Sequence, residues 1–543
     1  MFKSVLKYFF WLLIAFSLTI LLVFLKTEYS NSFSTSPEIW VKNSMERVML
    51  QDSAENVHDI HLYAARGEYE SFQIAVRANQ SDTVVTDVQV SDLKAKGMSD
   101  RLLSQSNITL YREHYVNVTE PSPIWRGTTV KPLGKGWYPD GLIPFVDPQT
   151  GVDLVNAELD AVPFKLNQGS NQTIWVDIFV PRDATAGDYG GTYTVTSNLG
   201  QVSGKILLTV WNFELPQKPS LKSAFLSWEQ HDKNTLIELL KHRVMPVANI
   251  NPEDERELID QWGLSALRLP FWSGADYRTC SMASAPTAAV IREEGLKHQL
   301  DLMLYVYATD EIDDCKGLRE PLREWSKSIH QAGIKHLAVM APVPEFYDLV
   351  DIWVVNPERY DTAGEKITEV LRQGKEIWFY TFFVLGGNVP NWQIDFQPIN
   401  HRIAQGFINQ SLGLTGFLYW RVDTWTDDPW NNVDTNPHPD KSEHYPGEGM
   451  LIYPGTQVGI SGSIPSMRLK WIREGVEDYE YIEILKRGGY HDWAMKAVGE
   501  VAQDLHHWNQ DPAVLNAVRR KLGAKNSSTI SVKLITRKSS DGH

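Results

Sequence analysis

The hydrophobic period of the chain changes after Pro216, and this change constrains the fold more than any other feature. Beyond it, short apolar runs alternate with amphipathic stretches of helical period. Near-continuous apolar runs are typical of parallel strands buried on both faces, and eight strand–helix alternations predict a (β/α)8 TIM-like barrel. The intervals after the second and fifth runs are short, so we expect one or two degenerate helices. The eight runs are residues 223–228, 244–250, 265–272, 302–311, 336–342, 351–356, 376–381 and 416–422.

The preceding part of the chain has the period of β-strands instead. Apolar and polar residues alternate in segments such as 71–78 and 172–181, and Gly, Asp, Asn and Ser separate these segments. The pattern predicts an antiparallel β-sandwich. We therefore expect a multidomain chain, with a sandwich at 38–216, a barrel with C-terminal helices at 217–525, and a tail at 526–543.

The first 37 residues predict a membrane anchor. Residues 8–25 are an uncharged apolar run, and as a helix this run spans roughly the ~30 Å hydrocarbon core of a bilayer. Lys3 and Lys7 precede it, so the positive-inside bias places residues 1–7 in the cytoplasm and the folded domains outside. Residues 26–37 are polar and Ser-rich, as expected of a stalk. We expect a single-pass cell-membrane protein, or a secreted one if the run is instead a cleaved signal peptide.

The composition and motifs of the chain limit the kinds of ligand that we expect it to bind. The net charge is −15, and an acidic chain without a basic stripe is not expected to bind nucleic acid. Metal-ligand spacing and dinucleotide, nucleotide or serine-hydrolase motifs are missing from the sequence, so we expect no metal and no cofactor. The two cysteines, Cys280 and Cys315, each follow a predicted strand end. They are a possible disulfide outside the cytoplasm, and two free buried thiols are the alternative.

One predicted strand end carries two adjacent carboxylates. In a barrel of this type the active site lies at the carboxyl ends of the strands, and Asp310 and Glu311 close the run 302–311. Both side chains can reach the mouth if the strand rolls into a loop there. The alternative is that Asp310 caps the next helix and Glu311 faces solvent. Asp310 and Glu311 are therefore the candidate catalytic residues.

Aromatic residues crowd the other strand ends and the loops that follow them. A mouth lined with Trp and Tyr around carboxylates favours sugar binding, although we expect about half of these residues to pack the barrel wall. Glu448 lies in the last predicted loop over the mouth, where it either contacts substrate hydroxyls or satisfies backbone amides in a Gly-rich turn. The candidate substrate-binding residues are Tyr380, Trp272, Trp420, Trp425, Trp430 and Glu448.

The adjacency of the two acids selects among mechanisms of glycoside hydrolysis. Carboxyls that flank a sugar lie about 5–5.5 Å apart in retaining enzymes and about 6.5–9.5 Å apart in inverting ones. Neighbours on one strand do not easily flank a sugar in this way. They suit substrate-assisted hydrolysis, in which the 2-acetamido carbonyl oxygen of the sugar is the nucleophile. Asp310 then orients the acetamido N–H, and Glu311 is the general acid and later the base.

Motifs in both halves resemble glycoside hydrolase family 123 and the wider group of DUF4091-type proteins. The resemblance implies an exo-acting β-N-acetylgalactosaminidase that uses Asp310 and Glu311 by the substrate-assisted route, with Tyr380 as a partner of the acetamido group. Ile312 follows the acidic pair where the family commonly has Pro. The matching segments include YATDE (307–311), GFLYWRVDTW (416–425), GEGMLIYPG (447–455), ARGEYESFQIAV (65–76) and GWYPDGLIPF (136–145).

A further part of the resemblance lies on the last predicted barrel helix, 466–488. Its R-x-G-x-E-D-x-E signature is expected to be structural, because it is far from the strand ends. The signature residues are Arg473, Gly475, Glu477, Asp478 and Glu480.

Two rival functions stay open at this point. One is a non-hydrolytic carbohydrate-binding surface protein built on the same barrel. The other is a glycosidase for a sugar without a 2-acetamido group, in which a further carboxylate has to act as the nucleophile. In each case we expect a glycan or glycoconjugate as the ligand, and the oligomeric state is not predicted.

Overall fold

The computed structural model describes residues 36–540 except positions 80, 81, 98, 99, 156, 230 and 441, with side chains described up to Thr529. The predicted cytoplasmic segment 1–7, the anchor 8–25 and nearly all of the stalk 26–37 lie outside the described residues. Within the described part, none of the helices combines the length and apolar character needed to cross a bilayer.

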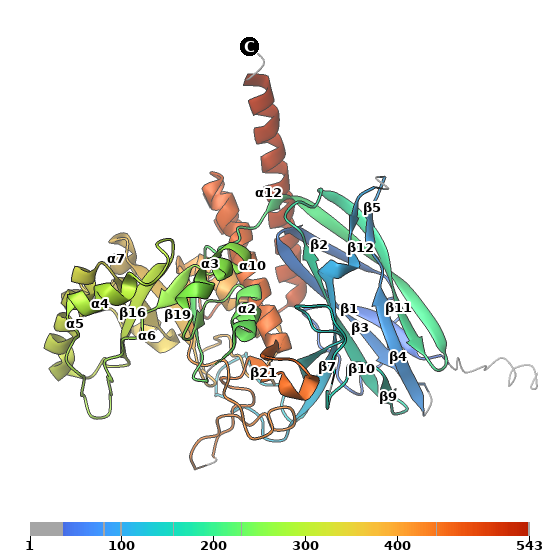
Figure 1. Cartoon of the computed structure of the whole chain (residues 1–543), viewed down its shortest axis with the longest axis horizontal. Helices are drawn as coiled ribbons and strands as arrows, with labels where there is room; N and C mark the ends of the chain where they lie inside the picture. Colours follow the sequence, from blue (N-terminus) through green and yellow to red (C-terminus); the bar gives the residue numbers. More distant parts are fainter. Residues whose placement is uncertain are drawn as a thin grey trace, which may run out of the picture.

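The N-terminal domain consists of two β-sheets that share one hydrophobic core (Figure 1). All pairs are antiparallel except β2 and β12, which run parallel, so the prediction of a purely antiparallel sandwich is wrong at this pair. Strands β3 and β10 are buried along almost their whole length because the C-terminal half covers their outer face. One sheet has the order β1 (Glu38–Asn43), β3 (Glu68–Arg77), β10 (Asn171–Val180), β7 (Ile108–Val118) and β8 (Gly136–Pro144). The other has β2 (Ile60–Arg66), β12 (Gly200–Glu214), β11 (Gly187–Ser197), β4 (Thr83–Val90) and β9 (Phe164–Leu166), with β5 (Leu93–Ala95) and β6 (Leu102–Leu103) beside β11.

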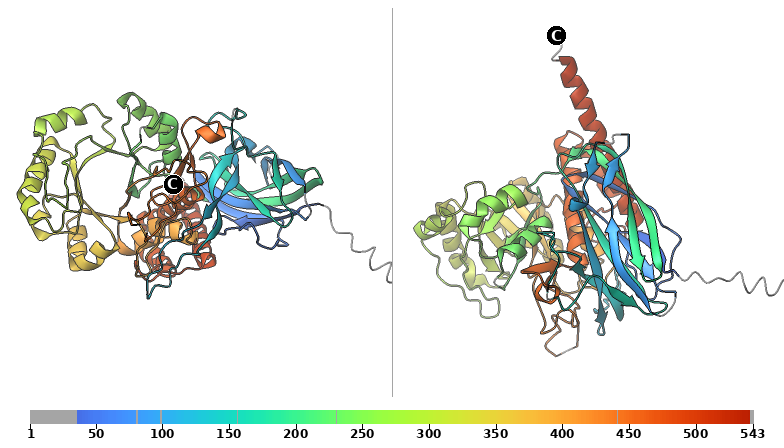
Figure 2. Two further views of the ribbon diagram at one scale, coloured as in Figure 1. Left: turned by 90° about the horizontal axis from the view of Figure 1, so that it is seen from below. Right: turned by 45° about the vertical axis from the view of Figure 1, so that its right-hand side comes forward.

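The C-terminal domain is a nearly closed parallel barrel of eight strands, which Figure 2 shows end-on. Each predicted apolar run overlaps one of these strands, so the sequence-based prediction of eight parallel strands is confirmed. The strands are β13 (Lys222–Leu226), β14 (Pro246–Val247), β15 (Ala266–Arg268), β16 (Met303–Asp310), β17 (Lys335–Val339), β18 (Ile352–Val355), β19 (Glu376–Thr381) and β20 (Gly416–Tyr419).

The barrel departs from a regular (β/α)8 fold in two places. The order runs from β14 through β13 and β20 round to β15, and no ladder joins β14 to β15 among the described residues. Between β17 and β18 the chain makes only a 3-10 turn, η3 (Pro344–Phe346), as the short fifth interval predicted. The short second interval, by contrast, holds a full helix, α3 (Pro252–Trp262), so one helix is degenerate, within the one or two expected. The helices are α2 (Lys233–Lys241), α3 (Pro252–Trp262), α4 (Ala288–Gly295), α5 (Arg319–Ala332), α6 (Pro357–Ala363), α7 (Glu365–Arg372), α8 (Ile399–Arg402), α9 (Asn409–Leu412) and α10 (Met467–Arg487).

The lumen of the barrel is closed at the amino-terminal end of its strands. Lys222 and Lys335 pair there with Glu376, at 2.6 and 2.9 Å. The indole N–H of Trp378 donates to the same carboxylate, and its ring packs edge-on against Tyr305 with centroids 6.2 Å apart. Because these side chains fill the lower lumen, we expect a ligand to bind at the carboxyl ends of the strands.

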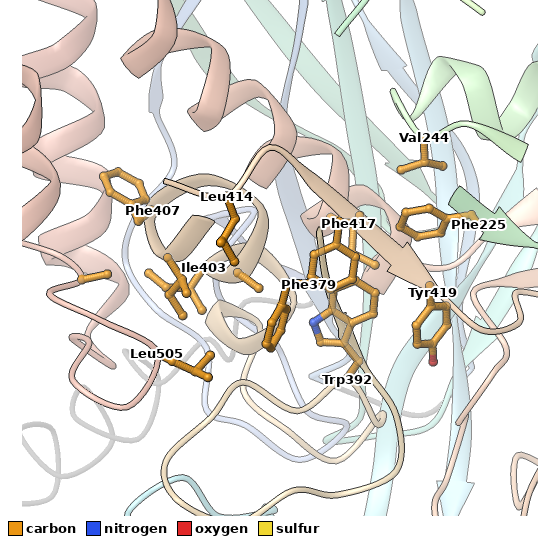
Figure 3. Close-up of a cluster of buried hydrophobic side chains, with 14 of the residues drawn as sticks. Phe225, Val244, Phe379, Trp392, Ile403, Phe407, Leu414, Phe417, Tyr419 and Leu505 are labelled. Carbon is orange, nitrogen blue, oxygen red and sulfur yellow. The ribbon is translucent and has the colours of Figure 1, made fainter. Parts of the chain in front are cut away.

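The outward faces of the same strands form a second aromatic layer. Phe379 and Phe417 pack with ring centroids 5.6 Å apart, and Trp392 stacks on Phe417 at 4.9 Å (Figure 3). Ile403 and Phe407, from the helical segment after β19, cover this layer. The strand that carries Tyr380 is thus held rigidly from both sides.

Helix α10 lies between the sandwich and the barrel (Figures 1 and 2). Lys470 and Arg473 pair with Asp177 of β10 at 2.9 and 2.5 Å, and Arg468 pairs with Asp140 of β8 at 2.8 Å. All five side chains are buried. Paired charges, rather than an apolar face alone, therefore join the two domains.

The other side of α10 packs against the helix after β19. Arg402 pairs with Glu474 and Asp478 at 2.5 and 2.7 Å. A Cβ at Gly475 would lie 2.3 Å from the carbonyl oxygen of Arg402, so only glycine permits this close crossing. The R-x-G-x-E-D-x-E signature is thus structural, as expected.

Two helices follow α10 at the C-terminal end of the described chain. They are α11 (His491–Gly499) and α12 (Pro512–Ser540), and α12 continues past Asn526 without interruption. The Asn526 amide donates to the carbonyl of Tyr481, and Arg519 pairs with Asp478 at 2.8 Å. The described chain therefore ends in a helix docked beside α10.

Candidate active site

The acidic pair lies where β16 bends at the mouth of the barrel. The register of β16 against β17 shifts between Tyr307 and Thr309, which marks a β-bulge just before the pair. Asp310 is the last strand residue, and Glu311 has φ of 53°, in the left-handed region that non-glycine residues rarely adopt. The Glu311 amide donates to the Val339 carbonyl at 2.8 Å, which holds this backbone in place. The bulge and the left-handed residue together let both side chains face the mouth, at a local cost in backbone strain.

Asp310 is largely buried, and its neighbour is a second acid, Glu311. The Tyr307 hydroxyl donates to Oδ1 of Asp310 at 3.0 Å. Burial, followed by the negative charge of Glu311, raises the pKa of Asp310 from near 3.8 to about 6. Asp310 therefore changes its charge just below neutral pH.

Glu311 is held by a tyrosine and an arginine from two other strand ends. The Tyr380 hydroxyl donates to Oε1 of Glu311 at 2.5 Å, and Arg359 Nη1 donates to the same oxygen at 3.0 Å. Arg359 also donates to the Tyr380 hydroxyl at 2.7 Å, and its Nε pairs with Asp313 at 2.9 Å. Burial and the nearby Glu311 carboxylate raise the pKa of Tyr380 far above its ordinary value, so this hydroxyl remains a donor.

Two exposed indoles form the rim of the mouth. Trp272 is 44% exposed and lies edge-on to Tyr307, with centroids 5.6 Å apart. Trp228, which follows β13, is 67% exposed; Arg421 lies 4.9 Å over its ring, and Trp420 packs against it edge-on. Exposed, immobilised indole faces beside carboxylates suit a sugar ring.

A saturated carboxylate ties the loops after β13 and β20 together. Asp423 is buried and accepts hydrogen bonds from five donors, which are Ser227 Oγ, the amides of Trp228 and Glu229, Arg421 Nε and the His231 ring. Burial opposes its ionisation, but these donors hold the pKa of Asp423 well below its usual range. Asp423 therefore positions Trp228 and has no capacity left for substrate.

The sandwich domain contributes to the same end of the barrel. Its segment between β7 and β8 packs on the loop after β19, where Trp125 donates to the Val384 carbonyl at 2.9 Å. Ser122 donates to Asp395 of that loop at 2.7 Å through its hydroxyl. The loop that continues from Tyr380 is thus supported by both domains.

Comparison with known proteins identifies the family. Residues 310–485 match the model of the glycoside hydrolase 123 catalytic domain, and residues 45–197 match that of the glycoside hydrolase 123 N-terminal domain. The chain belongs to glycoside hydrolase family 123. The catalytic-domain match begins at Asp310 and so includes both acids of the pair. This family 123 member is accordingly a glycoside hydrolase.

A solved structure supports the fold of this family 123 hydrolase. The family 123 glycoside hydrolase from Clostridium perfringens, described in work on glycolipid glycan hydrolysis, gives a TM-score of 0.63 at 15% identity. The match covers 92% of this chain and 100% of that chain. A β-glucuronidase from Parabacteroides merdae gives a TM-score of only 0.28 at 10% identity over 82% of this chain and 52% of that one, too weak to carry an argument. No curated protein matches the sequence.

The structure does not bring every predicted residue of the hydrolase to the mouth. Trp430 is 1% exposed, its ring contacts Tyr453 in a tilted arrangement, and it packs among residues of the sandwich, so its predicted sugar contact is wrong. Trp425 is partly buried, and its indole donates to the Ile452 carbonyl at 2.9 Å. Both loop residues contribute to packing between the domains.

Glu448 has a different position from the one expected. It is fully buried, so the predicted contact with substrate hydroxyls is not made. Trp420 Nε1 and Gln393 Nε2 each donate to its carboxylate at 2.5 Å. These two side chains and a backbone hydrogen bond from Phe383 hold the carboxylate, which orients Trp420 behind Trp228.

Sequence reasoning missed Arg359 and Tyr307. Arg359 follows the predicted run 351–356 by three residues, in the first turn of α6, where the Asn356 side chain caps its amide. An arginine so soon after a strand end is a usable signal in a barrel, because the carboxyl ends of all strands share one mouth. Tyr307 lies three residues before Asp310, and only the bulge explains how its hydroxyl reaches that carboxylate.

The two cysteines are joined. Cys280 and Cys315 form a disulfide with Cα atoms 5.3 Å apart, so the bridge, rather than the pair of free thiols, is present. It links the loop after β15, which carries Trp272, to the loop after β16, which carries Glu311. The bridge thereby restrains two walls of the mouth relative to each other.

Proposed function

We propose that this glycoside hydrolase removes a terminal 2-acetamido sugar, of the β-N-acetylgalactosaminide type, by substrate-assisted catalysis with retention of configuration. The observation that carries the proposal is the adjacency of Asp310 and Glu311 at one strand end, with both side chains held at the same mouth. Neighbouring acids cannot easily flank an anomeric carbon, so the substrate itself supplies the nucleophile.

Each acid has a separate task in this mechanism. The Asp310 carboxylate accepts the acetamido N–H and thereby directs the acetamido carbonyl oxygen toward the anomeric carbon. As that oxygen bonds to the carbon, the glycosidic bond breaks and Glu311 gives its proton to the leaving oxygen. The Glu311 carboxylate then takes a proton from a water molecule, which opens the oxazolinium-like intermediate at the anomeric carbon.

Tyr380 and Arg359 prepare Glu311 for this cycle. Both donate to the same carboxylate oxygen, so they fix the direction of the acid and stabilise its charged form after proton transfer. Tyr380 is also the proposed partner of the acetamido group, since its hydroxyl extends from β19 to Glu311, next to Asp310. Asp313 holds the far side of the Arg359 guanidinium.

The other carboxylates near the mouth are poor nucleophiles. Asp423 is saturated by five donors, and Glu448 is buried and bonded to Trp420 and Gln393. Glu229 is exposed and pairs with Arg421 at 3.2 Å, so it is the carboxylate to which the rival mechanism would turn for a sugar without an acetamido group.

The test compares matched aryl glycosides. The full-length protein is expected to hydrolyse an aryl N-acetyl-β-galactosaminide, release the β-anomer first by NMR, and be inhibited by a thiazoline analogue of the intermediate. The aryl β-galactoside, identical except for a 2-hydroxyl, is the control and should react at least about a thousandfold more slowly. Hydrolysis of the control without thiazoline inhibition, together with its loss in Glu229→Gln, would instead establish the rival mechanism.

We further propose that the protein acts outside the cytoplasm, anchored by residues 8–25 or secreted after their cleavage. The Cys280–Cys315 bridge supports this location, because disulfides persist in oxidising compartments. An anchored protein is expected to be digested when intact cells are treated with protease, and a secreted one to be found in the medium. Domains that stay with the cells and become accessible to the protease only after the cytoplasm is opened would contradict the proposal.

A further inference from the structure

The opening between β14 and β15 contains a cavity. Both strands are short, and the described residues form no ladder between them. A cavity of about 500 Å³ lies at this seam, between the carboxyl ends of β13, β14 and β15 and the far end of α4. Its lining includes Leu226, Trp228, Val247, Asn249, Arg268 and Pro270.

The cavity adjoins the catalytic pair through β15 and β16. Arg268 lies opposite Tyr305 in the register of these strands. Pro270 lines the cavity, and Trp272, two residues later, lies edge-on to Tyr307, whose hydroxyl donates to Asp310. The seam cavity is therefore linked to the catalytic pair through Trp272 and Tyr307, on the β15 side of the mouth.

One charged group in the cavity has no counter-charge. The other charged or titratable side chains of the lining are engaged: Glu229 with Arg421 at 3.2 Å, Glu294 with Lys297 at 2.7 Å, His231 with Asp423 at 2.8 Å and His298 with Glu255 at 2.5 Å. Arg268 is partly buried, and within the described chain it has neither an ion pair nor a side-chain hydrogen bond.

The lack of a carboxylate partner for Arg268 is informative because the protein is acidic. The chain carries 67 Asp and Glu against 52 Lys and Arg, yet no carboxylate is placed on this guanidinium among the described residues. Partial burial of an unpaired charge is unfavourable, and a ligand oxyanion that binds both forks of a guanidinium removes that cost. The exposed face of Trp228 at the same cavity offers a flat surface for the ring that carries the oxyanion.

We propose that the seam cavity is a binding site for an oxyanionic substituent of the glycan, a sulfate ester or a carboxylate, and that Arg268 is the residue that binds it. The inference rests on the proposed function, since it places this substituent beside the scissile 2-acetamido sugar. The substituent is carried either by the terminal sugar itself or by the next sugar, and both have the same chemistry for Arg268.

The experiment uses two pairs of substrates with the full-length protein. The first pair is an aryl N-acetyl-β-galactosaminide with and without a 6-sulfate, which tests the terminal sugar. The second is N-acetylgalactosamine β-linked to glucuronic acid or to galactose, which tests the next sugar. The wild type is expected to prefer the anionic member of one pair by about tenfold or more in kcat/KM.

The variants assign that preference to one residue. Arg268→Gln should abolish the preference, and Arg268→Lys should keep part of it, because an ammonium retains the charge without the fork. Arg256→Gln, on the exposed side of α3, removes the same charge away from the cavity and should keep the wild-type ratio. A wild type that prefers neither anionic substrate, or an unchanged preference in Arg268→Gln, overturns the proposal.

Failure of the proposed function is distinguishable from failure of this site. If none of the four substrates is hydrolysed, calorimetric titration of the Glu311→Gln protein with the two disaccharides and the two aryl glycosides still tests the cavity. About tenfold tighter binding of the glucuronic acid disaccharide or the 6-sulfated glycoside, lost when Arg268→Gln is added, supports the site. Equal binding of anionic and neutral ligands contradicts it.

Discussion

Two aspartates of this protein, Asp177 at the domain interface and Asp310 at the barrel mouth, show opposite responses to burial. Lys470 and Arg473 pair with Asp177, and although burial opposes its ionisation, these cations hold its pKa well below the usual range. Asp310 has a tyrosine and another acid as neighbours, and its pKa rises to about 6. Burial is common to both positions, so the surrounding charges decide whether a carboxylate holds domains together or titrates near neutral pH.

The backbone conformation also differs between the domain interface and the barrel mouth. Helix α10 is regular along its length, and each of its acidic signature residues has a basic or hydroxyl partner. At the mouth, Glu311 adopts a left-handed conformation after a bulge. Backbone strain thus lies at the site where chemistry is proposed and is missing from the described interface helix.

The largest expected effect is the loss of activity in Glu311→Gln. Removal of the proposed acid should lower kcat about a thousandfold toward a disaccharide, and less toward a dinitrophenyl glycoside, whose leaving group needs no proton. The thermal midpoint should stay close to that of the wild type. Glu320→Gln, at an 83% exposed site on α5, is the matched control. Equal rates in Glu311→Gln and wild type would place the acid elsewhere.

Substitutions at the domain interface should lower the free energy of unfolding rather than the catalytic rate. Arg473→Met leaves Asp177 with one cation in a buried site, and breaking such a pair costs about 3–5 kcal/mol of unfolding free energy. Urea denaturation followed by fluorescence measures this loss. Lys218→Met removes one partner of an exposed pair with Asp301 and should cost less than about 1 kcal/mol. Similar losses in the two variants would show that the interface charges are not special.

Asp310→Asn is expected to separate activity from stability. Because the folded pKa of about 6 lies above the ordinary 3.8, the native state binds more protons between these values, and stability falls as pH rises through them. The asparagine variant, which avoids this loss, should be about 1–3 kcal/mol more stable than wild type at pH 7 and equal to it near pH 4. It should also lose most activity. A stability difference that does not change with pH would contradict the burial of a charge at this site.

The smallest expected effect is a displacement of the pH profile in Arg359→Met. In the wild type, kcat/KM should fall below about pH 6 as Asp310 gains its proton. The guanidinium lowers the pKa of Asp310, so its loss favours the protonated form of this acid, and the acidic limb of the profile should move upward by about one pH unit. Arg319→Met, at an exposed site in the first turn of α5, is the control. An acidic limb at the wild-type pH in Arg359→Met would limit Arg359 to a steric role.

The positions of the strands were predictable because the burial of a strand determines the pattern of apolar residues within its own segment. Strands covered on both faces are apolar along their length, and a strand ending in two acids stands out at a barrel mouth. The seam between β14 and β15 was not predictable, since periodicity reports burial and not which edges form hydrogen bonds. The parallel pairing of β2 with β12 was also not predictable. It joins segments that are distant in the chain, and local periodicity does not report which strands pair.

The missed and misplaced site residues have a common explanation. Arg359 meets Glu311 and Tyr380 across 48 and 21 positions of sequence, a proximity that only closure of the barrel creates. Trp430 and Glu448 belong to a loop that folds back against the sandwich and its own strand end, so their burial depends on partners outside any local pattern. Residue type and strand-end position were informative, whereas the direction of a long loop was not.

The charges shared between α10 and the sandwich bear on how such an enzyme can change over generations. A barrel transferred to another scaffold would carry Arg468, Lys470 and Arg473 into a surface without Asp140 and Asp177, leaving buried cations uncompensated. Substitution at one of these positions therefore requires a compensating substitution in the other half. The two modules are consequently inherited as one unit, and recombination between relatives is tolerated only where both sides of the interface are exchanged together.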